Sequence, residues 1–256
     1  MVEEPKAHGI ARKVRTILAV TTWSIVAFFL AQVITIGIVQ FINMVAPALL
    51  ESSRNMVVVA LSSFIYILMM VILLFLPRVI GQRSPSRTVL GIHKELRWRD
   101  IGLSLPAVVI YFVATTATLF LAMQFLPWMN VDQVQETGLS IVAPGGELIW
   151  IFLLLVVVGP IVEELIFRGY LYGKIRAARV PFWLTAIIVS VLFGLAHMQW
   201  NVGIDTFVLS MVMCFARELT GTIWTGVLMH MIKNGIAYYF LFINPLAISS
   251  LGLMGL

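Results

Sequence analysis

The stretch 148-LIWIFLLLVVVGPIVEELIFR-168 decides the fold of this chain. Residues 148–158 carry no charge, and a membrane-spanning helix needs about 20 mostly apolar residues, so the stretch predicts such a helix. It nevertheless ends in three charged side chains, Glu163, Glu164 and Arg168. An ionised side chain at the centre of a bilayer costs from about 3 to 10 kcal/mol or more. These three side chains must therefore face a protein interior or a wet cavity, and we expect the functional site there.

The composition of the whole chain is that of a polytopic membrane protein. Of its 256 residues 61% are hydrophobic and 11% are charged, and the mean hydropathy is +1.01. Soluble domains contain about 25% charged residues. The net charge is +5, but the basic residues gather in short loops between apolar stretches, which is typical of a topology signal. We therefore expect membrane lipids as partners, and no nucleic acid.

Apolar stretches along the chain predict an all-α, polytopic helix bundle with about seven transmembrane helices. The sixth stretch is short, about 13 residues, so it is either a complete span or a short, partly buried helix. The apolar residues at the end of the chain, 246–256, are too few to span and are expected at the membrane interface. The seven stretches are 17–42, 56–76, 101–126, 148–172, 182–199, 204–216 and 222–243.

The charges of the loops predict the orientation in the membrane. The first span is preceded by Arg12, Lys13 and Arg15, and the loop 78–100 is rich in Lys and Arg, whereas residues 127–147 contain neither. Because positive charge concentrates in cytoplasmic loops, the N-terminus is expected to be cytoplasmic and, with seven spans, the C-terminus outside. The loop 78–100 is either an amphipathic stretch lying on the membrane surface or a solvated basic loop near anionic headgroups.

Helical geometry assigns different environments to the two adjacent glutamates. Glu164 and Arg168 are four residues apart, so they are neighbours of opposite charge on one helix face and are expected to form an ion pair. Glu163 points about 100° away from Glu164 and has no partner on its own helix. A buried carboxylate of this kind is a candidate general base or acid. The alternative is that all three charges form an ion network that only holds helices together.

Two of the four histidines, His197 and His230, lie in separate apolar stretches. Each alone would more often be a structural histidine, but together with intramembrane glutamates they indicate a shared site. Phe193 precedes His197 by four residues, so its ring is expected beside the imidazole. Asn234 follows His230 by four residues, and its amide can either stabilise a developing oxyanion or cross-link helices.

The spacing of Glu163 and His197 from a predicted turn places them at a similar depth. If the fourth helix continues to Ala178 and the chain turns at 179–181, Glu163 lies 15 residues before Ala178, and His197 lies 15 residues after Phe182. At 1.5 Å per residue both are about 22 Å from the turn. An antiparallel hairpin then brings them to one level.

These residues resemble the CPBP family of CAAX proteases and bacteriocin-processing or immunity proteins, also called the ABI family. The family pattern is EExxxR, then FxxxH, then HxxxN or HxxxB, on successive membrane helices. Here the motifs occur in that order at residues 163–168, 193–197 and 230–234. The segment RELTGTIW, residues 217–224, also resembles the part of the family that precedes the last motif. The resemblance covers about residues 160–234.

The resemblance implies an intramembrane endopeptidase that hydrolyses a peptide bond of a membrane-associated or lipid-modified protein substrate. Carried over by position, Glu163 and His197 would activate a water molecule for attack on the peptide carbonyl, and His230 and Asn234 would bind the oxyanion. The compact chain suits a prokaryotic member in the cell membrane, with bacteriocin maturation, immunity or signal-peptide processing as its duties. Three further residues would shape or stabilise the site: Glu164, Arg168 and Phe193.

No cofactor is expected, because the resemblance favours a metal-free glutamate mechanism. Zinc is the alternative. Glu163, His197 and His230 would match the set of two histidines and one glutamate that binds zinc in some peptidases. However, the HExxH motif of many zinc peptidases is absent from the sequence.

The resemblance also divides the chain into three regions. Residues 1–147 form an N-terminal region of three spans and a basic cytoplasmic loop, residues 148–243 form the CPBP-type catalytic core, and residues 244–256 form an apolar C-terminal tail. Two other functions remain open. A non-catalytic bacteriocin-immunity or membrane partner-binding protein would use the same polar cluster. A small transporter or proton relay would also need buried Glu and His, but the sequence shows no repeat symmetry typical of transporters.

Overall fold

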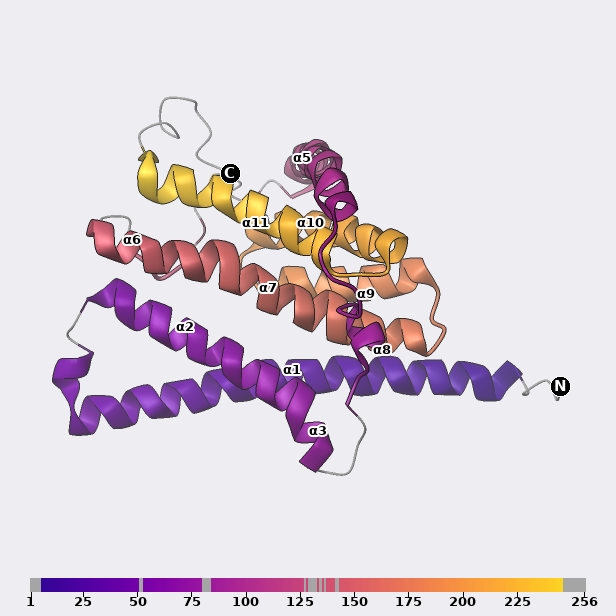
Figure 1. Ribbon diagram of the computed structural model, residues 1–256, viewed down its shortest axis with the longest axis horizontal. Helices are drawn as coiled ribbons and strands as arrows, with labels where there is room; N and C mark the ends of the chain where they lie inside the picture. Colours follow the sequence, from indigo (N-terminus) through magenta and orange to yellow (C-terminus); the bar gives the residue numbers. More distant parts are fainter. Residues whose placement is uncertain are drawn as a thin grey trace.

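The computed structural model describes residues 6–50, 53–79, 84–126, 128, 133, 135, 137–140 and 143–245 (Figure 1). All regular structure in these residues is helical, so the predicted all-α class is confirmed. Five helices are long and apolar enough to cross a membrane, which confirms a polytopic bundle. The predicted interfacial tail, 246–256, lies outside the described residues. The five are Gly9–Val45, Arg54–Val79, Trp98–Phe125, Gly145–Ala177 and Trp224–Ile243.

The first helix, α1 (Lys6–Val45), has 40 residues and extends beyond the predicted span at both ends. Such a helix is about 60 Å long. Ala27 and Ala31, one turn apart, are completely buried, because small side chains allow neighbouring helices to approach closely in a membrane. The chain then passes through η1 (Pro47–Leu49) into α2 (Arg54–Met70), η2 (Val71–Phe75) and α3 (Leu76–Val79).

The basic segment after α3 is held against the core. It contains the short helix α4 (Arg87–Leu90). Arg217 donates a hydrogen bond to Val89 O at 3.2 Å, and Trp224 Nε1 donates one to Lys94 O at 2.7 Å. Backbone carbonyls of this segment are therefore bound by the later helices. The basic side chains themselves are exposed: Arg87, Lys94, Arg97 and Arg99.

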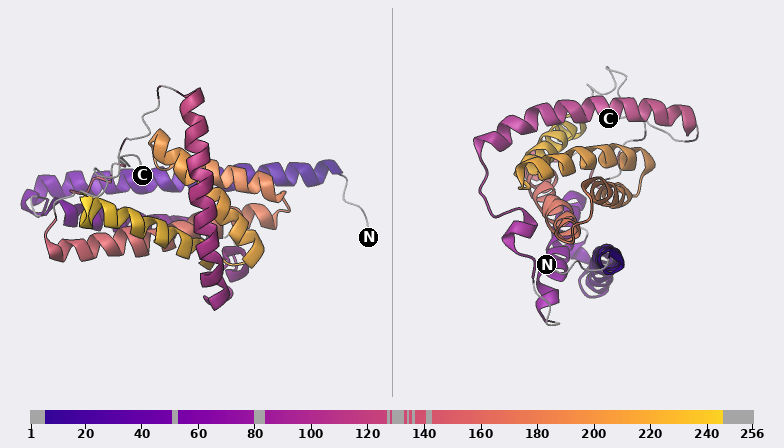
Figure 2. Two further views of the ribbon diagram at one scale, coloured as in Figure 1. Left: turned by 90° about the horizontal axis from the view of Figure 1, so that it is seen from above. Right: turned by 90° about the vertical axis from the view of Figure 1, so that its right-hand side faces the viewer.

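Helix α5 (Trp98–Phe125) runs across the other long helices rather than alongside them (Figure 2). It packs against two helices from the C-terminal half, α10 and α11. Asp100 in its first turn accepts a hydrogen bond from Thr225 Oγ1 at 3.0 Å. This bond fixes the start of α5 on the helix that carries His230.

The fourth predicted span, 148–172, forms a longer continuous helical rod, 145–177. Two π-helical segments interrupt its α-helical geometry on either side of the glutamates. Such segments are rare and are frequently found at functional sites. The rod consists of α6 (Gly145–Phe152), η3 (Leu153–Val158), α7 (Gly159–Glu164), η4 (Leu165–Leu171) and α8 (Tyr172–Ala177).

The chain turns after the rod at the predicted place, between Ala177 and Phe182, where α9 (Phe182–Leu195) begins. α9 has 14 residues, about 21 Å, so it is too short to cross a membrane by itself. It ends before His197, which therefore lies in the turn to the next helix instead of on the predicted span 182–199.

Helix α10 (Trp200–Thr220) has 21 residues and is longer than the predicted 204–216. It is not among the apolar candidates for a span, since it carries Asp205, Arg217 and Glu218. The shortness of α9 and the charges of α10 explain why the structure shows five candidate spans where the sequence suggested about seven. The last helix is α11 (Trp224–Tyr238), which continues into η5 (Tyr239–Ile243).

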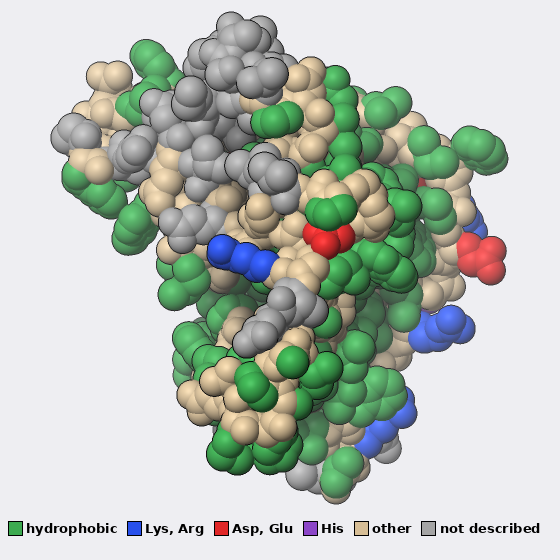
Figure 3. All heavy atoms as spheres, turned by 90° about the vertical axis from the view of Figure 1, so that its left-hand side faces the viewer, with side chains coloured by type: hydrophobic (Ala, Val, Ile, Leu, Met, Phe, Trp, Pro, Cys, Tyr) green, Lys and Arg blue, Asp and Glu red, His purple; other side chains and the backbone are tan. Residues whose placement is uncertain are grey.

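The helix ends lie on two opposite sides of the bundle. In Figure 1 the N-terminal end of α1 and the C-terminal end of α8 lie on the right, whereas the α1–α2 connection, the start of α6 and the end of η5 lie on the left. The right-hand ends carry the basic residues before the first span and those at the end of α8. Seen from the left, most of the described surface is hydrophobic, with few charged side chains (Figure 3).

Candidate active site

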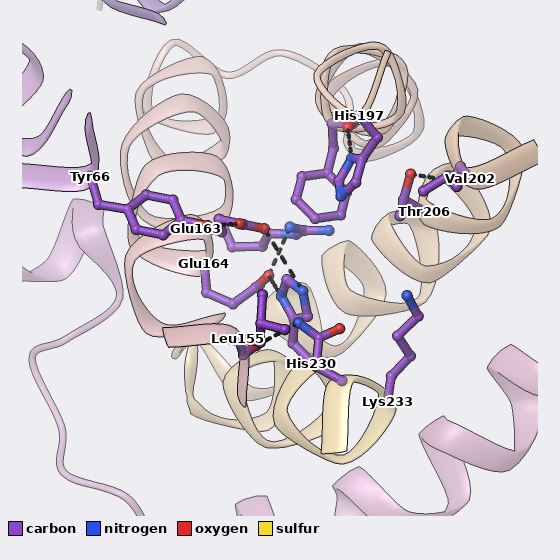
Figure 4. A network of polar contacts seen from close by, with 12 residues as sticks. Tyr66, Leu155, Glu163, Glu164, His197, Val202, Thr206, His230 and Lys233 are labelled. Carbon is purple, nitrogen blue, oxygen red and sulfur yellow. Dashed lines mark hydrogen bonds and ion pairs between the residues drawn. The ribbon is translucent and has the colours of Figure 1, made fainter. Parts of the chain in front are cut away.

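The three motifs predicted from the sequence meet in one place (Figure 4). Glu163 and Glu164 come from α7, His230 comes from α11, and His197 comes from the turn after α9. Tyr66 of α2 joins them. Four elements far apart in the chain thus supply one polar cluster within apolar helices.

Glu164 and Arg168 form the predicted ion pair. Arg168 Nη1 donates to Glu164 Oε1 at 2.8 Å, and both side chains are fully buried. The guanidinium also lies over the ring of Phe193, with its central carbon 4.4 Å from the ring centroid. The ring face attracts a cation, so Phe193 helps to hold the buried Arg168.

Gly226 of α11 makes room for the second oxygen of Glu164. A Cβ added to Gly226 would lie 2.9 Å from Glu164 Oε2, closer than real Cβ contacts. This oxygen has no hydrogen-bond partner among the residues that the structure describes. The approach of α11 to α7 therefore depends on a residue without a side chain.

Glu163 has no partner on its own helix, as predicted, but side chains from two other helices lie beside its carboxylate. Its Oε1 accepts a hydrogen bond from the hydroxyl of Tyr66 at 2.5 Å. Its Oε2 lies 3.8 Å from His230 Nε2, beyond direct hydrogen-bonding distance. The side chain is 21% exposed, in contrast to the fully buried Glu164. Glu163 is thus the accessible carboxylate of the pair.

His230 bridges the two glutamates. Its Nδ1 donates to Glu164 Oε1 at 3.2 Å, and its Nε2 faces Glu163. The ring of Phe193 stands perpendicular to the imidazole, with the ring centroids 5.8 Å apart. The imidazole is therefore fixed in orientation by one carboxylate and one aromatic ring.

His197 is oriented by the helix that it follows. Its Nδ1 donates to Phe193 O at 2.8 Å, and the Phe193 ring lies 5.0 Å away in a T-shaped arrangement, as the spacing predicted. In neutral imidazole one nitrogen donates and the other accepts. Since Nδ1 is the donor, Nε2 carries the lone pair that can accept a proton.

Asn234 makes the helix cross-link that was one of its two predicted roles. Its Nδ2 donates to Leu155 O at 2.8 Å. In η3 the amide of Gly159 donates five residues back, to Leu154 O. The next donor in this register would be the amide of Pro160, which has no hydrogen. Leu155 O consequently lacks that backbone partner and accepts the side chain of Asn234 instead.

Zinc does not fit the described side chains as they are placed. No group of three or more His, Cys, Asp or Glu residues among them is arranged to hold a metal ion. The alternative ligand set was Glu163, His197 and His230. Nδ1 of each histidine is hydrogen-bonded to another group, which leaves the Nε2 atoms as the possible ligands, and His230 Nε2 lies 3.8 Å from Glu163 Oε2. A ligand set would place all three donors at about 2 Å from one point.

Three polar residues near the site were not singled out from the sequence: Tyr66, Asp205 and Lys233. Tyr66 lies in an apolar stretch without any motif, so only its hydroxyl group, which needs a partner when it is buried, hinted at a role. Asp205 and Lys233 are charges inside or beside apolar helices. The same energetic argument that located Glu163 could have found them.

Comparisons with known proteins agree with the motifs. Residues 145–236 match the family model described as type II CAAX prenyl endopeptidase Rce1-like. Over 235 residues the chain is 25% identical to the membrane-embedded CAAX protease MroQ of Staphylococcus aureus, which covers 88% of this chain and 90% of that protein. Both similarities support the resemblance to the CPBP family that the motifs indicated.

A shorter similarity points to the same class of protein. Over 78 residues, 30% of this chain and 32% of the relative, the chain is 30% identical to the putative membrane peptidase YdiL of Bacillus subtilis. No solved structure matches the chain. The family consists of CAAX protease-like intramembrane peptidases, and the bacterial, membrane-embedded relatives confirm the predicted multi-pass location in a membrane.

Proposed function

We propose that this CPBP protein is an intramembrane endopeptidase that hydrolyses a peptide bond of a membrane-associated or lipid-modified protein. The observation that carries the proposal is the position of Glu163. This carboxylate is partly exposed, is held by Tyr66, and lies in one cluster with two oriented imidazoles inside an apolar bundle. A positioned carboxylate and imidazole are the groups that general acid–base catalysis requires.

The proposed reaction needs no metal. Glu163, with the free Nε2 of His197, takes a proton from a water molecule, whose oxygen attacks the carbonyl carbon of the peptide. The resulting oxyanion accepts hydrogen bonds from His230 and Asn234. Collapse of the tetrahedral intermediate breaks the C–N bond, and the proton held by Glu163 passes to the leaving amine. One water is consumed and two peptides are released.

The charges around His230 suit its role in this reaction. When His230 is an imidazolium, its Nδ1–H is bound to Glu164 and its Nε2–H is available to the oxyanion. Glu163, Glu164, Arg168 and His230 then carry two negative and two positive charges, which sum to zero. A neutral cluster avoids most of the cost of burying an isolated charge in an apolar environment.

Asn234 can contribute to the oxyanion site while it cross-links helices. Its amide has two hydrogens, and the bond to Leu155 O uses one of them. The second hydrogen is the one we assign to the substrate oxyanion.

The test compares the membrane proteomes of host cells that carry wild type, Glu163→Gln or Glu147→Gln. Glu147 is a matched control because its carboxylate accepts a hydrogen bond from Asn55 at 3.0 Å, away from the site. We expect uncleaved precursors to accumulate only with Glu163→Gln. If this variant processes the same proteins as wild type, the proposed reaction is wrong. If it also supports the host as wild type does, a non-catalytic partner-binding function takes its place.

A further inference from the structure

A second charged cluster lies beside the proposed catalytic residues. Lys233 Nζ is 3.5 Å from Asp205 Oδ2, and Tyr111 donates a hydrogen bond to Asp205 Oδ1 at 2.6 Å. The three residues come from α11, α10 and α5. Neither sequence motifs nor the proposed reaction uses them.

Asp205 is fixed, whereas Lys233 is loosely held. Tyr111 is 2% exposed, so its short bond anchors the Asp205 carboxylate to α5. Lys233 has three N–H donors, and its polar contact among the described residues is the one to Asp205. At 3.5 Å this contact is longer than the 2.7–2.9 Å of a typical charge-assisted hydrogen bond. The Lys233 ammonium can therefore accept a further anionic partner.

Lys233 points toward the space where the proposed chemistry takes place. In Figure 4 its side chain extends from α11 toward the space between His230 and Thr206 of α10. It follows His230 by three residues on the same helix, which is about 4.5 Å along the axis. The side chain is 16% exposed, so a ligand in the site can reach it.

A weakly bonded pair of opposite charges inside an apolar bundle contributes little to the stability of the fold. Desolvation of two buried ions is repaid only by good geometry and additional hydrogen bonds. Charges that persist in membrane-spanning segments are usually functional. The proposed substrate is a peptide, and the anionic group of an unmodified peptide at neutral pH is a carboxylate.

We propose that Lys233 binds a carboxylate of the peptide substrate, with Asp205 as the counter-ion that the substrate carboxylate displaces. This inference rests on the proposed function. An extended peptide advances about 3.3 Å per residue, so the carboxylate lies within a few residues of the cleaved bond. Its source is either the C-terminal carboxylate of the substrate or an acidic side chain.

The experiment measures the binding of four short peptides to the purified full-length protein in detergent. N-acetyl-Leu-Ile-Met is used as the free acid and as the C-terminal amide. N-acetyl-Leu-Asp-Met amide is compared with N-acetyl-Leu-Asn-Met amide. The first pair tests a terminal carboxylate, and the second pair tests a side-chain carboxylate. Wild type is expected to prefer the carboxylate member of one pair by roughly tenfold, the size of one hydrogen bond to a charged group.

Two variants should change this preference in opposite directions. Lys233→Met should abolish it, whereas Asp205→Asn, which removes the competing carboxylate, should increase it. Lys174→Met is the control, because Lys174 lies over the Tyr170 ring at the far end of the rod, and it should keep the wild-type preference. If Lys233→Met does not fold, the double variant Lys233→Met with Asp205→Asn replaces it, because it leaves no unpaired charge. The double variant should also lose the preference for the carboxylate peptide.

Several outcomes overturn the inference. It is wrong if wild type binds both members of each pair equally, or if it binds none of the peptides. It is wrong if the preference survives in Lys233→Met. It is also wrong if Asp205→Asn weakens the preference. Failure of the proposed function is separate, because Glu163→Gln should keep the carboxylate preference. Cleavage without that preference contradicts only the role of Lys233, and a preference without any cleavage contradicts only the peptidase function.

Discussion

Tyr66 and Glu163, 97 residues apart in the chain, are joined by a hydrogen bond of 2.5 Å. Gly159 stands beside this bond, since a Cβ added there would lie 3.2 Å from the Tyr66 hydroxyl. The N-terminal region thus does more than surround the proposed catalytic core in the membrane. Its second helix supplies the group that orients the proposed general base.

Tyr66→Phe should lower the turnover of the substrates found by the proteome comparison by about tenfold or more, because Glu163 loses the donor that fixes its oxygen. The effect should fall on kcat rather than KM, since Tyr66 holds the base and not the substrate. Tyr238→Phe is the matched control. It also removes a hydroxyl, one that donates to Leu148 O at 2.9 Å, and it should leave kcat within about twofold. Equal effects of the two variants on kcat would contradict a positioning role.

Gly226→Ala should destabilise the protein by about 1–3 kcal/mol, the range for overpacking a close contact. The new Cβ would meet Glu164 Oε2 at 2.9 Å and separate α11 from α7. Gly235→Ala on the same helix is the control, because its nearest contact is an ordinary 3.7 Å to Val156 Cγ1. Alanine favours a helix over glycine by about 1 kcal/mol, so the control should be neutral or stabilising. Unfolding in detergent measures both, and a stable Gly226→Ala would disprove the close approach.

Arg168→Met should cost about 3–5 kcal/mol of stability, because it leaves the fully buried Glu164 without its cation. The double variant Glu164→Gln with Arg168→Met should recover much of this loss. Arg176→Met offers the contrast of a partly exposed ion pair, with Glu218, and should cost no more than about 1 kcal/mol. Equal losses from Arg168→Met and Arg176→Met would show that burial does not control the strength of the first pair.

Pro160→Ala should raise the stability of the protein and lower its activity. The new amide hydrogen can donate to Leu155 O and compete with Asn234, and the removal of a proline from a helix interior is favourable by up to about 3 kcal/mol. We expect unfolding at a higher denaturant concentration together with slower peptide cleavage, because both the glutamates and Asn234 would shift. Faster cleavage by this variant would count against the π-helical geometry as a requirement of the site.

Chelators should not change the rate of cleavage by the purified protein, since the described carboxylates and imidazoles form no group suited to a metal. The measurement compares initial rates before and after incubation with 1,10-phenanthroline and EDTA. Inhibition that added zinc reverses would show that zinc takes part in the reaction. Metal analysis of the same preparation provides an independent readout.

The parts of the site that depend on one helix could be predicted from the sequence. The Glu164–Arg168 pair follows from a four-residue spacing, and the contact of Phe193 with His197 follows in the same way. The turn before Phe182 was also expected, because Pro181 and the basic residues before it end the rod. In each case the outcome is set by residues close together in the chain.

The rest of the site could not be predicted because it depends on how distant segments pack. Nothing near Tyr66 indicates that Glu163 will be its partner. The place of His197 in a turn results from the end of α9 at Leu195, and no proline or charge marks that end in the sequence. The number of spans was uncertain for a similar reason, since a composition window does not show whether the charges of α10 find buried partners such as Tyr111.

The bond between Asn234 and Leu155 has a consequence for which side chains position 234 can hold. The oxygen of Leu155 is an acceptor, so the partner must bring a hydrogen. An aspartate of the same shape would place a second acceptor against the carbonyl and repel it, and a leucine would leave the oxygen without any partner. The missing amide hydrogen of a proline in one helix thereby selects a carboxamide in another, and it links the chemical identity of one residue to the backbone of a helix 79 positions away.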